Sequence, residues 1–198
     1  MVIPGFFKGT EMPTTGWWQA LWPDPAGVSM KVGIGPGMEV IDLCSGDGWF
    51  TMQIAGLCRH VTAIDVDRQL LDAAAQRLAQ NNLSNCKFVE GDAYDIAMLI
   101  QRPADFVFMA NVFHGVPQRT RLAQAVLTVL KPGGRFAIVN WNDTPREQTT
   151  LLGEPRGRAT ELRMTPQATI ADVEPAGFKL NSIVELPPYH YGAIFEKP

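Results

Sequence analysis

Acidic residues stand at the ends of several short apolar runs, at positions where a side chain can bind a ligand. Asp42 and Asp65 close two successive runs and lie 23 residues apart. At this spacing the second acid can accept hydrogen bonds from both hydroxyls of a ribose. Gly46 and Gly48 follow the first acid and allow a tight turn in which backbone N–H groups approach a ligand closely.

The charge of this turn indicates what kind of ligand it suits. Asp42 and Asp47 disfavour a pyrophosphate and favour a ligand that carries an ammonium and a sulfonium group. The third glycine of a dinucleotide-binding fingerprint would fall at position 51, where the chain has Thr51. A glycine-rich turn also suits plain packing of a helix on a strand, so that alternative stays open.

Polar residues follow two further apolar runs. Asp92 can accept a hydrogen bond from an exocyclic amine, and Ala93 and Val66 can flank an aromatic ring, although turn formation is the alternative role for Asp92. Asn111 and His114 follow the fourth run and would place a carboxamide and an imidazole beside the same pocket. For His114 the alternative is packing within its loop.

The elements that must position these residues alternate between strand and helix. Helical periodicity predicts helices over 67–82, with Asp67 as N-cap, over 118–130, ending at Lys131-Pro132-Gly133-Gly134, and over 165–176. The β-rich segments are 38–43, 60–65, 87–90, 105–110, 135–141, 178–186 and 189–196. This order predicts an α/β, doubly wound, Rossmann-like fold. Its seven-stranded mixed sheet is mostly parallel with an antiparallel closing strand, and helices cover both faces.

The flanking segments are less regular. Residues 1–30 are expected to form an N-terminal aromatic extension before a single domain over 31–198. Its Trp17 and Trp18, together with Trp22, would form either a lid over the site or a helix packed on the sheet edge.

The polar segment 142–163 is expected to leave the core after the fifth strand. Its arginines, Arg146, Arg156, Arg158 and Arg163, are candidates for binding an anionic substrate, Arg156 and Arg158 above all, and a solvated loop is the alternative.

Composition excludes several classes of protein. With 198 residues, 46% hydrophobic, the chain can build a core, and its net charge of −3 does not favour nucleic-acid binding. We expect no membrane span, no secretory signal and no metal site. Three cysteines without metal-type spacing suit a reducing, cytoplasmic environment.

Six motifs together resemble those of the class I S-adenosylmethionine-dependent methyltransferases, and more closely their small type 11/12 methyltransferase-domain group. The motifs are DLCSGDG at 42–48, AIDVD at 63–67, EGDAYD at 90–95, NVFHGV at 111–116, LKPGGRFAIVNW at 130–141 and HYGAIFEK at 190–197. The resemblance covers roughly residue 31 to the C-terminus. Cys44 departs from it, because the family's first motif usually has glycine there.

The resemblance implies that S-adenosyl-L-methionine is the cofactor and S-adenosyl-L-homocysteine the product. The cofactor-binding residues would be Asp42, Cys44, Ser45, Gly46, Gly48 and Asn111 near the methionine part, Asp65 at the ribose, and Val66, Asp92 and Ala93 at the adenine. A sulfonium methyl is already activated, so direct in-line transfer to a small-molecule acceptor is expected. His114 is the candidate general base, with Tyr189, His190 and Tyr191 behind it.

Other functions stay open at this point. A non-catalytic cofactor-binding protein would keep the same pocket, and an NAD(P)-dependent oxidoreductase is disfavoured by the acids and by Thr51. Protein or RNA acceptors are weakly disfavoured by the acidic balance. The absence of Asn-Pro-Pro-Tyr after the fourth strand disfavours DNA-base and glutamine methylation. The protein is expected to be a monomer or a homodimer.

Overall fold

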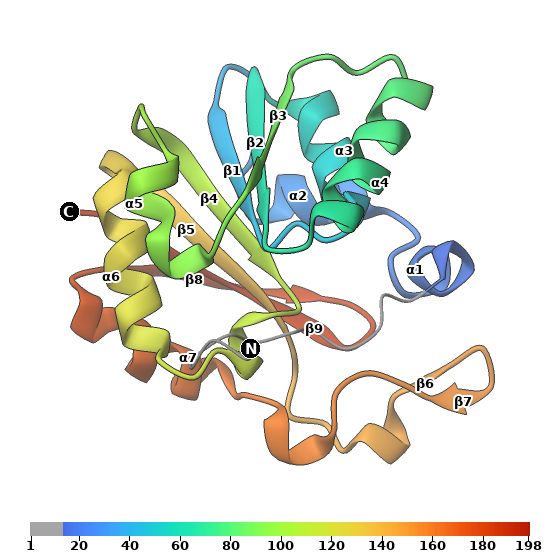
Figure 1. Cartoon of the computed structure of the whole chain (residues 1–198). Coiled ribbons are helices and arrows are strands. Elements are labelled where there is room, and N and C mark those ends of the chain that lie inside the picture. The colour runs from blue at the N-terminus through green and yellow to red at the C-terminus, as the bar shows by residue number, and fades with distance from the viewer. Residues whose placement is uncertain (1–13) are drawn as a thin grey trace, which may run out of the picture.

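A twisted seven-stranded sheet runs through the part of the chain that the structure describes (Figure 1). The computed structural model describes residues 14–198, so residues 1–13 of the predicted extension lie outside the described residues. The strands are β1 (Glu39–Leu43), β2 (His60–Asp65), β3 (Cys86–Glu90), β4 (Ala104–Ala110), β5 (Leu130–Trp141), β8 (Lys179–Leu186) and β9 (His190–Glu196). Their order is β3-β2-β1-β4-β5-β9-β8, and β9 is antiparallel to both neighbours while the other pairs are parallel. The predicted fold is confirmed.

The central strands are mostly apolar because they are covered on both faces. In β4, the side chains of Phe106, Val107, Phe108 and Met109 are fully buried. Alternate residues point to opposite sides, so Phe108 packs in one core cluster and Met109 in the other. β1 pairs with both β2 and β4, so the strand order reverses between β1 and β4, where ligands of such folds bind.

Helices form a layer on each face of the sheet. One layer holds α1 (Thr15–Leu21), α2 (Pro25–Lys31), α3 (Trp49–Leu57) and α4 (Arg68–Gln80), and the other holds α5 (Ile96–Leu99), α6 (Arg119–Val129) and α7 (Pro166–Val173) (Figure 1). Within residues 14–198, no helix is long and apolar enough to cross a membrane.

The three predicted helices form within a few residues of their expected bounds, and side-chain caps begin two of them. Asp67 Oδ1 accepts a hydrogen bond of 2.8 Å from Gln69 N at the start of α4. Thr165 Oγ1 accepts one of 3.0 Å from Ala168 N at the start of α7, and Gly177 follows the end of that segment with a φ of +106°. These contacts satisfy backbone groups that a helix end otherwise leaves unpaired.

The start of β5 differs from the prediction. Leu130 already pairs with Ala104, and regular pairing resumes at Arg135, so the glycine-rich stretch bulges out within the strand. Gly133 has a φ of +71°, and its N–H donates to the carbonyl of Lys197 at 2.9 Å. The residues expected to form a turn therefore form a bulge within β5. Backbone hydrogen bonds of Gly133 and Gly134 with Lys197 hold this bulge against the end of the chain.

The tryptophans of the N-terminal helices pack into the core beside α3. Trp22 is 1% exposed, with its ring 5.5 Å from Phe50 and 4.4 Å from His190. Trp18 is buried and stacks on Trp49 at 6.3 Å. Trp18 and Trp22 thus pack against α3 and the first residue of β9. Movement of this aromatic segment as a lid and the domain boundary near residue 30 stay predictions.

Residues 142–163, which we call the excursion, leave the sheet after β5 and return before α7. They form the short antiparallel ribbon β6 (Thr150–Leu151) and β7 (Glu154–Pro155), and the 3₁₀ turns Arg146–Gln148 and Thr160–Leu162. Figure 1 shows the ribbon extending beyond the end of the sheet, below α1. α1 and β6 are in contact. The excursion is thus an ordered structure next to the carboxyl edge of the sheet.

Replacing Trp22 by alanine should lower the free energy of unfolding by about 3–5 kcal/mol, because a large, fully buried side chain leaves a cavity. Urea unfolding followed by circular dichroism measures this. Trp17→Ala is the matched control, since the Trp17 side chain is only partly buried and should cost less than half as much. Equal losses for the two variants would show that α1 does not dock on the core through Trp22.

Candidate functional site

Carboxylates from the ends of β1, β2 and β3 gather around Cys44. Burial is the main cause that raises the pKa of the Cys44 thiol, and the negative charges of Asp65, Asp42 and Asp92 raise it further. The thiol is therefore protonated and unreactive at neutral pH. The structure thus brings together the acids that the sequence places at separate strand ends.

The carboxylate of Asp65 is oriented by two backbone N–H groups. Its Oδ2 accepts from Gly46 N at 2.8 Å and its Oδ1 accepts from Asp67 N at 3.0 Å. Burial raises the pKa of Asp65, and these backbone hydrogen bonds oppose the rise. Each oxygen keeps a further lone pair, so the carboxylate can accept two more hydrogen bonds from a ligand.

Asp42 is held between β1 and α3. It is 3% exposed, and its Oδ2 accepts a hydrogen bond of 2.5 Å from Thr51 Oγ1. Burial raises the pKa of Asp42 to about 7; the Thr51 hydrogen bond opposes this shift, and the charge of Asp65 adds to it. Threonine at position 51 therefore has a role that the glycine of a dinucleotide fingerprint cannot perform.

Asp47 differs from the sequence-based expectation. Arg77 of α4 donates to Asp47 Oδ2 at 2.6 Å and to its carbonyl oxygen at 3.1 Å. The same guanidinium lies 5.5 Å from the ring centre of Trp49. Asp47 is thus neutralised by an ion pair, and the negative charge of the site comes from Asp42 and Asp65.

The backbone of the β1–α3 loop takes left-handed conformations at three positions. The φ angles are +62° at Cys44, +57° at Gly46 and +79° at Gly48. A side chain is disfavoured in this region, so Cys44 is a strained substitute for glycine. A Cβ atom on Gly48 would also lie 2.7 Å from Ala74 Cβ, so this glycine permits α4 to pack closely. Ser45 Oγ is buried and has no hydrogen-bond partner within residues 14–198.

The residues expected at an adenine ring lie beside this loop. Asp92 Oδ1 accepts a hydrogen bond of 2.9 Å from Tyr94 N and caps the 3₁₀ turn Ala93–Asp95. The local turn role weighed for Asp92 is therefore present in the structure. Val66 and Ala93 are partly buried. Adenine binding by these residues stays a prediction.

Two histidine–asparagine pairs lie at the ends of β4, β5 and β9. His190 Nε2 is 2.9 Å from Asn111 Oδ1, and His114 Nδ1 is 3.4 Å from Asn140 Oδ1. An amide oxygen can only accept, so each contacting ring nitrogen carries the proton. The other nitrogens, His190 Nδ1 and His114 Nε2, then present lone pairs, and both are buried without a partner in the described residues.

Both histidines are neutral at physiological pH. Burial lowers the pKa of His114 to about 4, and the positive charge of Arg158 contributes to the decrease. Burial also lowers the pKa of His190 well below its usual range, with a further contribution from Arg163. On the sequence alone, His114 and Arg158 are separate candidates. In the structure the charge of Arg158 acts on His114.

The sequence interpretation missed Asn140, which is fully buried in β5. An amide among the apolar residues of a central strand was the signal that could have revealed it. Arg163 was expected to help bind an anionic substrate, but its contacts with backbone carbonyl groups of the folded excursion could not be predicted from the sequence.

The other residues expected to bind substrate lie around the excursion. Tyr189 donates its hydroxyl proton to Thr150 O at 2.9 Å, and its ring stacks on Trp141 at 6.1 Å. Trp17 lies 6.4 Å from the same indole. Arg156 and Arg158 are partly buried, whereas Trp18 lies in the core. Substrate contacts of these side chains stay predictions.

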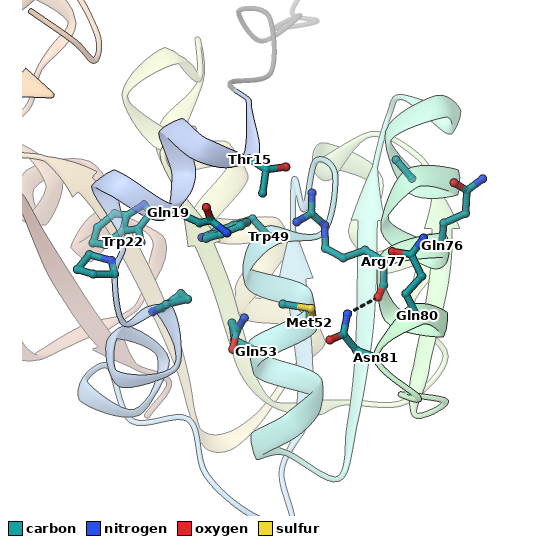
Figure 2. A pocket seen from close by; sticks show the side chains of 13 residues that line it. Thr15, Gln19, Trp22, Trp49, Met52, Gln53, Gln76, Arg77, Gln80 and Asn81 are labelled. Carbon is teal, nitrogen blue, oxygen red and sulfur yellow. Dashed lines mark hydrogen bonds between the residues drawn. The ribbon is translucent and has the colours of Figure 1, made fainter. Parts of the chain in front are cut away.

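A cavity of about 600 Å³ lies elsewhere, between α1, α3 and α4. Figure 2 shows Trp49 and Met52 of α3 on one side of it and Arg77 and Gln80 of α4 on the other. The strand-end carboxylates are not among its lining residues. The candidate site is therefore defined by the convergence of side chains at the sheet edge.

Comparison with known proteins gives the site a family. Residues 40–134 match the family described as methyltransferase domain, a range that holds β1 to β4, the carboxylate cluster and Asn111. Residues 40–134 therefore form a methyltransferase domain, and the fold of the chain is similar to that of S-adenosylmethionine-dependent methyltransferases of known structure. The β1–α3 loop is accordingly the first motif of a methyltransferase domain.

Curated relatives match this methyltransferase domain over part of their length. The biotin biosynthesis bifunctional protein BioHC of Cellvibrio japonicus is 35% identical over 50% of this chain and 19% of its own length. The tRNA 5-carboxymethoxyuridine methyltransferase of Escherichia coli is 27% identical over 62% of this chain and 47% of its own. The chain thus spans less than half of each of these relatives.

Solved structures share the fold over nearly the whole chain. A methyltransferase from Aquifex aeolicus has a TM-score of 0.78 at 22% identity and covers 93% of this chain and 94% of its own. The N-methyltransferase NodS from Bradyrhizobium japonicum, in complex with S-adenosyl-L-homocysteine, has a TM-score of 0.68 at 17% identity. That alignment covers 89% of this chain and 87% of NodS.

Replacing Gly48 by alanine should destabilise this methyltransferase domain by about 1–3 kcal/mol, because the new Cβ meets Ala74 and the residue has a positive φ. Thermal and urea unfolding measure the change. Gly56→Ala is the control: nothing lies within 4 Å of its Cβ position inside α3, so alanine there should be neutral or slightly stabilising. A Gly48→Ala protein as stable as the wild type would contradict the packing role.

Proposed function

We propose that the chain is an S-adenosylmethionine-dependent methyltransferase that moves a methyl group to a small-molecule acceptor by direct in-line transfer. The observation that carries this proposal is that the β1–α3 loop is held between two strand-end carboxylates: Asp65 Oδ2 accepts from Gly46 N at 2.8 Å, and Asp42 Oδ2 accepts from Thr51 Oγ1 at 2.5 Å. The match to a methyltransferase domain and the S-adenosyl-L-homocysteine complex of NodS support the choice of cofactor.

The residues at the loop fit such a cofactor. Asp65 offers free lone pairs to ribose hydroxyls in an orientation already set by Gly46 N and Asp67 N. Ser45 Oγ is a buried hydroxyl that still lacks a partner. Asp42 supplies negative charge next to the place where an ammonium and a sulfonium would lie, and a cation bound there would favour its ionised form.

When bound, S-adenosylmethionine supplies an electrophilic methyl group on a positively charged sulfur. The chain then has to orient an acceptor lone pair toward that methyl, exclude water and remove a proton from a hydroxyl or amine acceptor. α1 and the excursion lie at the carboxyl edge and are in contact through β6, so they are the segments placed to exclude water.

His114 is proposed to take the acceptor's proton at Nε2. Asn140 holds the proton on Nδ1, which leaves the Nε2 lone pair available in a buried position. Because burial lowers the pKa of His114 to about 4, the imidazole is neutral and can accept a proton throughout the physiological range. Such a low pKa makes the imidazole a weak base.

A small acceptor is favoured over a nucleic acid. The relatives include a tRNA methyltransferase and a protein of biotin biosynthesis, so the match to a methyltransferase domain leaves the acceptor class open. The net charge of this chain is −3, and phosphate-backbone binding depends on an excess of positive charge. The histidine pairs are also buried, which suits a ligand small enough to be enclosed.

Replacing Asp65 by alanine should weaken binding of S-adenosylmethionine at least tenfold, about 1.4 kcal/mol, because two ribose hydroxyls lose their acceptor. Calorimetric titration measures the dissociation constant. Asp67→Ala serves as control: it removes the N-cap of α4 and about 1 kcal/mol of stability, but should leave cofactor affinity unchanged. An unchanged dissociation constant for folded Asp65→Ala would remove this residue from the site.

His114 should make the fold sensitive to acid. Its pKa is about 4 in the folded chain and near 6.5 when unfolded, so between these values the unfolded chain binds a proton that the folded chain does not. Stability therefore falls as pH decreases from 6.5 to 4, by up to about 3 kcal/mol from this residue.

Urea unfolding of His114→Gln at several pH values tests this dependence. The variant should lose less stability than the wild type between pH 6.5 and about 4, because glutamine has no proton to gain. An unaltered slope in His114→Gln would contradict the buried neutral state.

A further inference from the structure

Charges of opposite sign are sorted between the two sides of the excursion. Its four carboxylates are exposed, at Asp143, Glu147, Glu154 and Glu161. Of its four arginines, Arg146 is exposed, Arg156 and Arg158 are partly buried and Arg163 is buried. Although the segment has no net charge, its positive groups are concentrated on the side that faces the protein.

Arg163 fixes this arrangement. Its guanidinium lies 5.0 Å from the ring centre of Trp141 and is 9% exposed. It donates hydrogen bonds of 2.5–3.1 Å to Thr144 O, Thr149 Oγ1, Arg156 O and Arg158 O. None of the ion pairs formed within residues 14–198 involves Arg163. The excursion is therefore folded around a buried cation that carbonyl groups solvate, and the negative charge of Glu147 acts on this cation without forming an ion pair with it.

Polar atoms without partners lie next to this positive charge. The buried atoms with no hydrogen-bond partner among the described residues include His114 Nε2, Asn140 Nδ2, His190 Nδ1 and Arg156 Nε. His114, Asn140 and His190 are at most 4% exposed. Unpaired buried polar atoms are costly, and a ligand that pairs with them recovers that cost. Two of these atoms, on Asn140 and Arg156, are N–H donors and require an acceptor.

A cavity lies between the excursion and the start of α7, and Arg156, Arg158 and the two histidines are not among its lining residues. It measures about 480 Å³, and its lining includes Arg119 and Arg163 together with Glu161 and Asp172. Asp172 is paired with Arg119 at 3.2 Å, and Arg119 also donates to the carbonyl of His114 at 2.8 Å. Cavities of a few hundred cubic ångströms typically hold small ligands.

We infer that the inner side of the excursion binds an anionic group of the methyl acceptor, a carboxylate or a phosphate, through Arg156 and Arg158. This inference rests on the proposed function, because the bound molecule is the acceptor of that reaction. Arg163 is a positioning residue that holds both arginines by their carbonyl groups. An anion at this place would accept a hydrogen bond from the buried Arg156 Nε–H.

The test measures binding of benzoate, benzamide and inorganic phosphate to protein saturated with S-adenosyl-L-homocysteine. Calorimetry or the shift in melting temperature gives the affinity. At least one of the two anions should bind the wild type about tenfold more tightly than the neutral, isosteric benzamide. Arg156→Gln should abolish that preference, while the matched variant Arg146→Gln, in the exposed arginine of the same excursion, should keep it within about twofold.

Benzoate and phosphate distinguish the two sources of the anionic group, because preferential binding of one assigns the acceptor to carboxylic acids or to phosphate esters. Equal binding of benzamide and the anions, binding of none of them, or an unchanged preference in Arg156→Gln would overturn the inference. If S-adenosyl-L-homocysteine binds and the anions do not, only this inference fails. If S-adenosyl-L-homocysteine itself does not bind, the proposed function fails.

Discussion

Burial of negative charge at the carboxyl edge of the sheet is the constraint on which the rest of the structure depends. Removing Asp42 and Asp65 from water is unfavourable, and burial accordingly raises the pKa of both. Hydrogen bonds from Thr51 Oγ1, Gly46 N and Asp67 N offset this cost. The β1–α3 loop places the Gly46 N–H against Asp65. In doing so it takes left-handed conformations not only at Gly46 and Gly48 but also at Cys44. The strain is thus a consequence of where the charges lie.

The opposite charge is concentrated on the other side of the same edge. β1 and β2 carry the carboxylates, whereas the excursion after β5 carries inward-facing arginines around two neutral histidines. In the proposed reaction a positively charged methyl donor lies at the first cluster and an anionic acceptor at the second. The strand-order reversal between β1 and β4 is what brings the two clusters to one edge.

Features that depend on local pattern were predictable from the sequence. The apolar strands, the Asp67 cap and the acids at the strand ends all follow from short-range signals, and the structure has them where expected. Pairings across the chain were not predictable. Asp47 is neutralised by Arg77, 30 residues away, and Asn140 orients His114 from a different strand. No spacing rule encodes such contacts, because they depend on how helices and strands pack in three dimensions.

The central claim is that the β1–α3 loop and Asp65 form a site for a cationic, adenosine-containing cofactor. Calorimetric titration of the wild-type chain with S-adenosylmethionine, S-adenosyl-L-homocysteine and NADH, in parallel, tests it most directly. The account predicts micromolar binding of the two sulfur ligands and no binding of NADH, whose pyrophosphate would meet Asp42 and Asp65. Binding of NADH alone, or of none of the three, would contradict it.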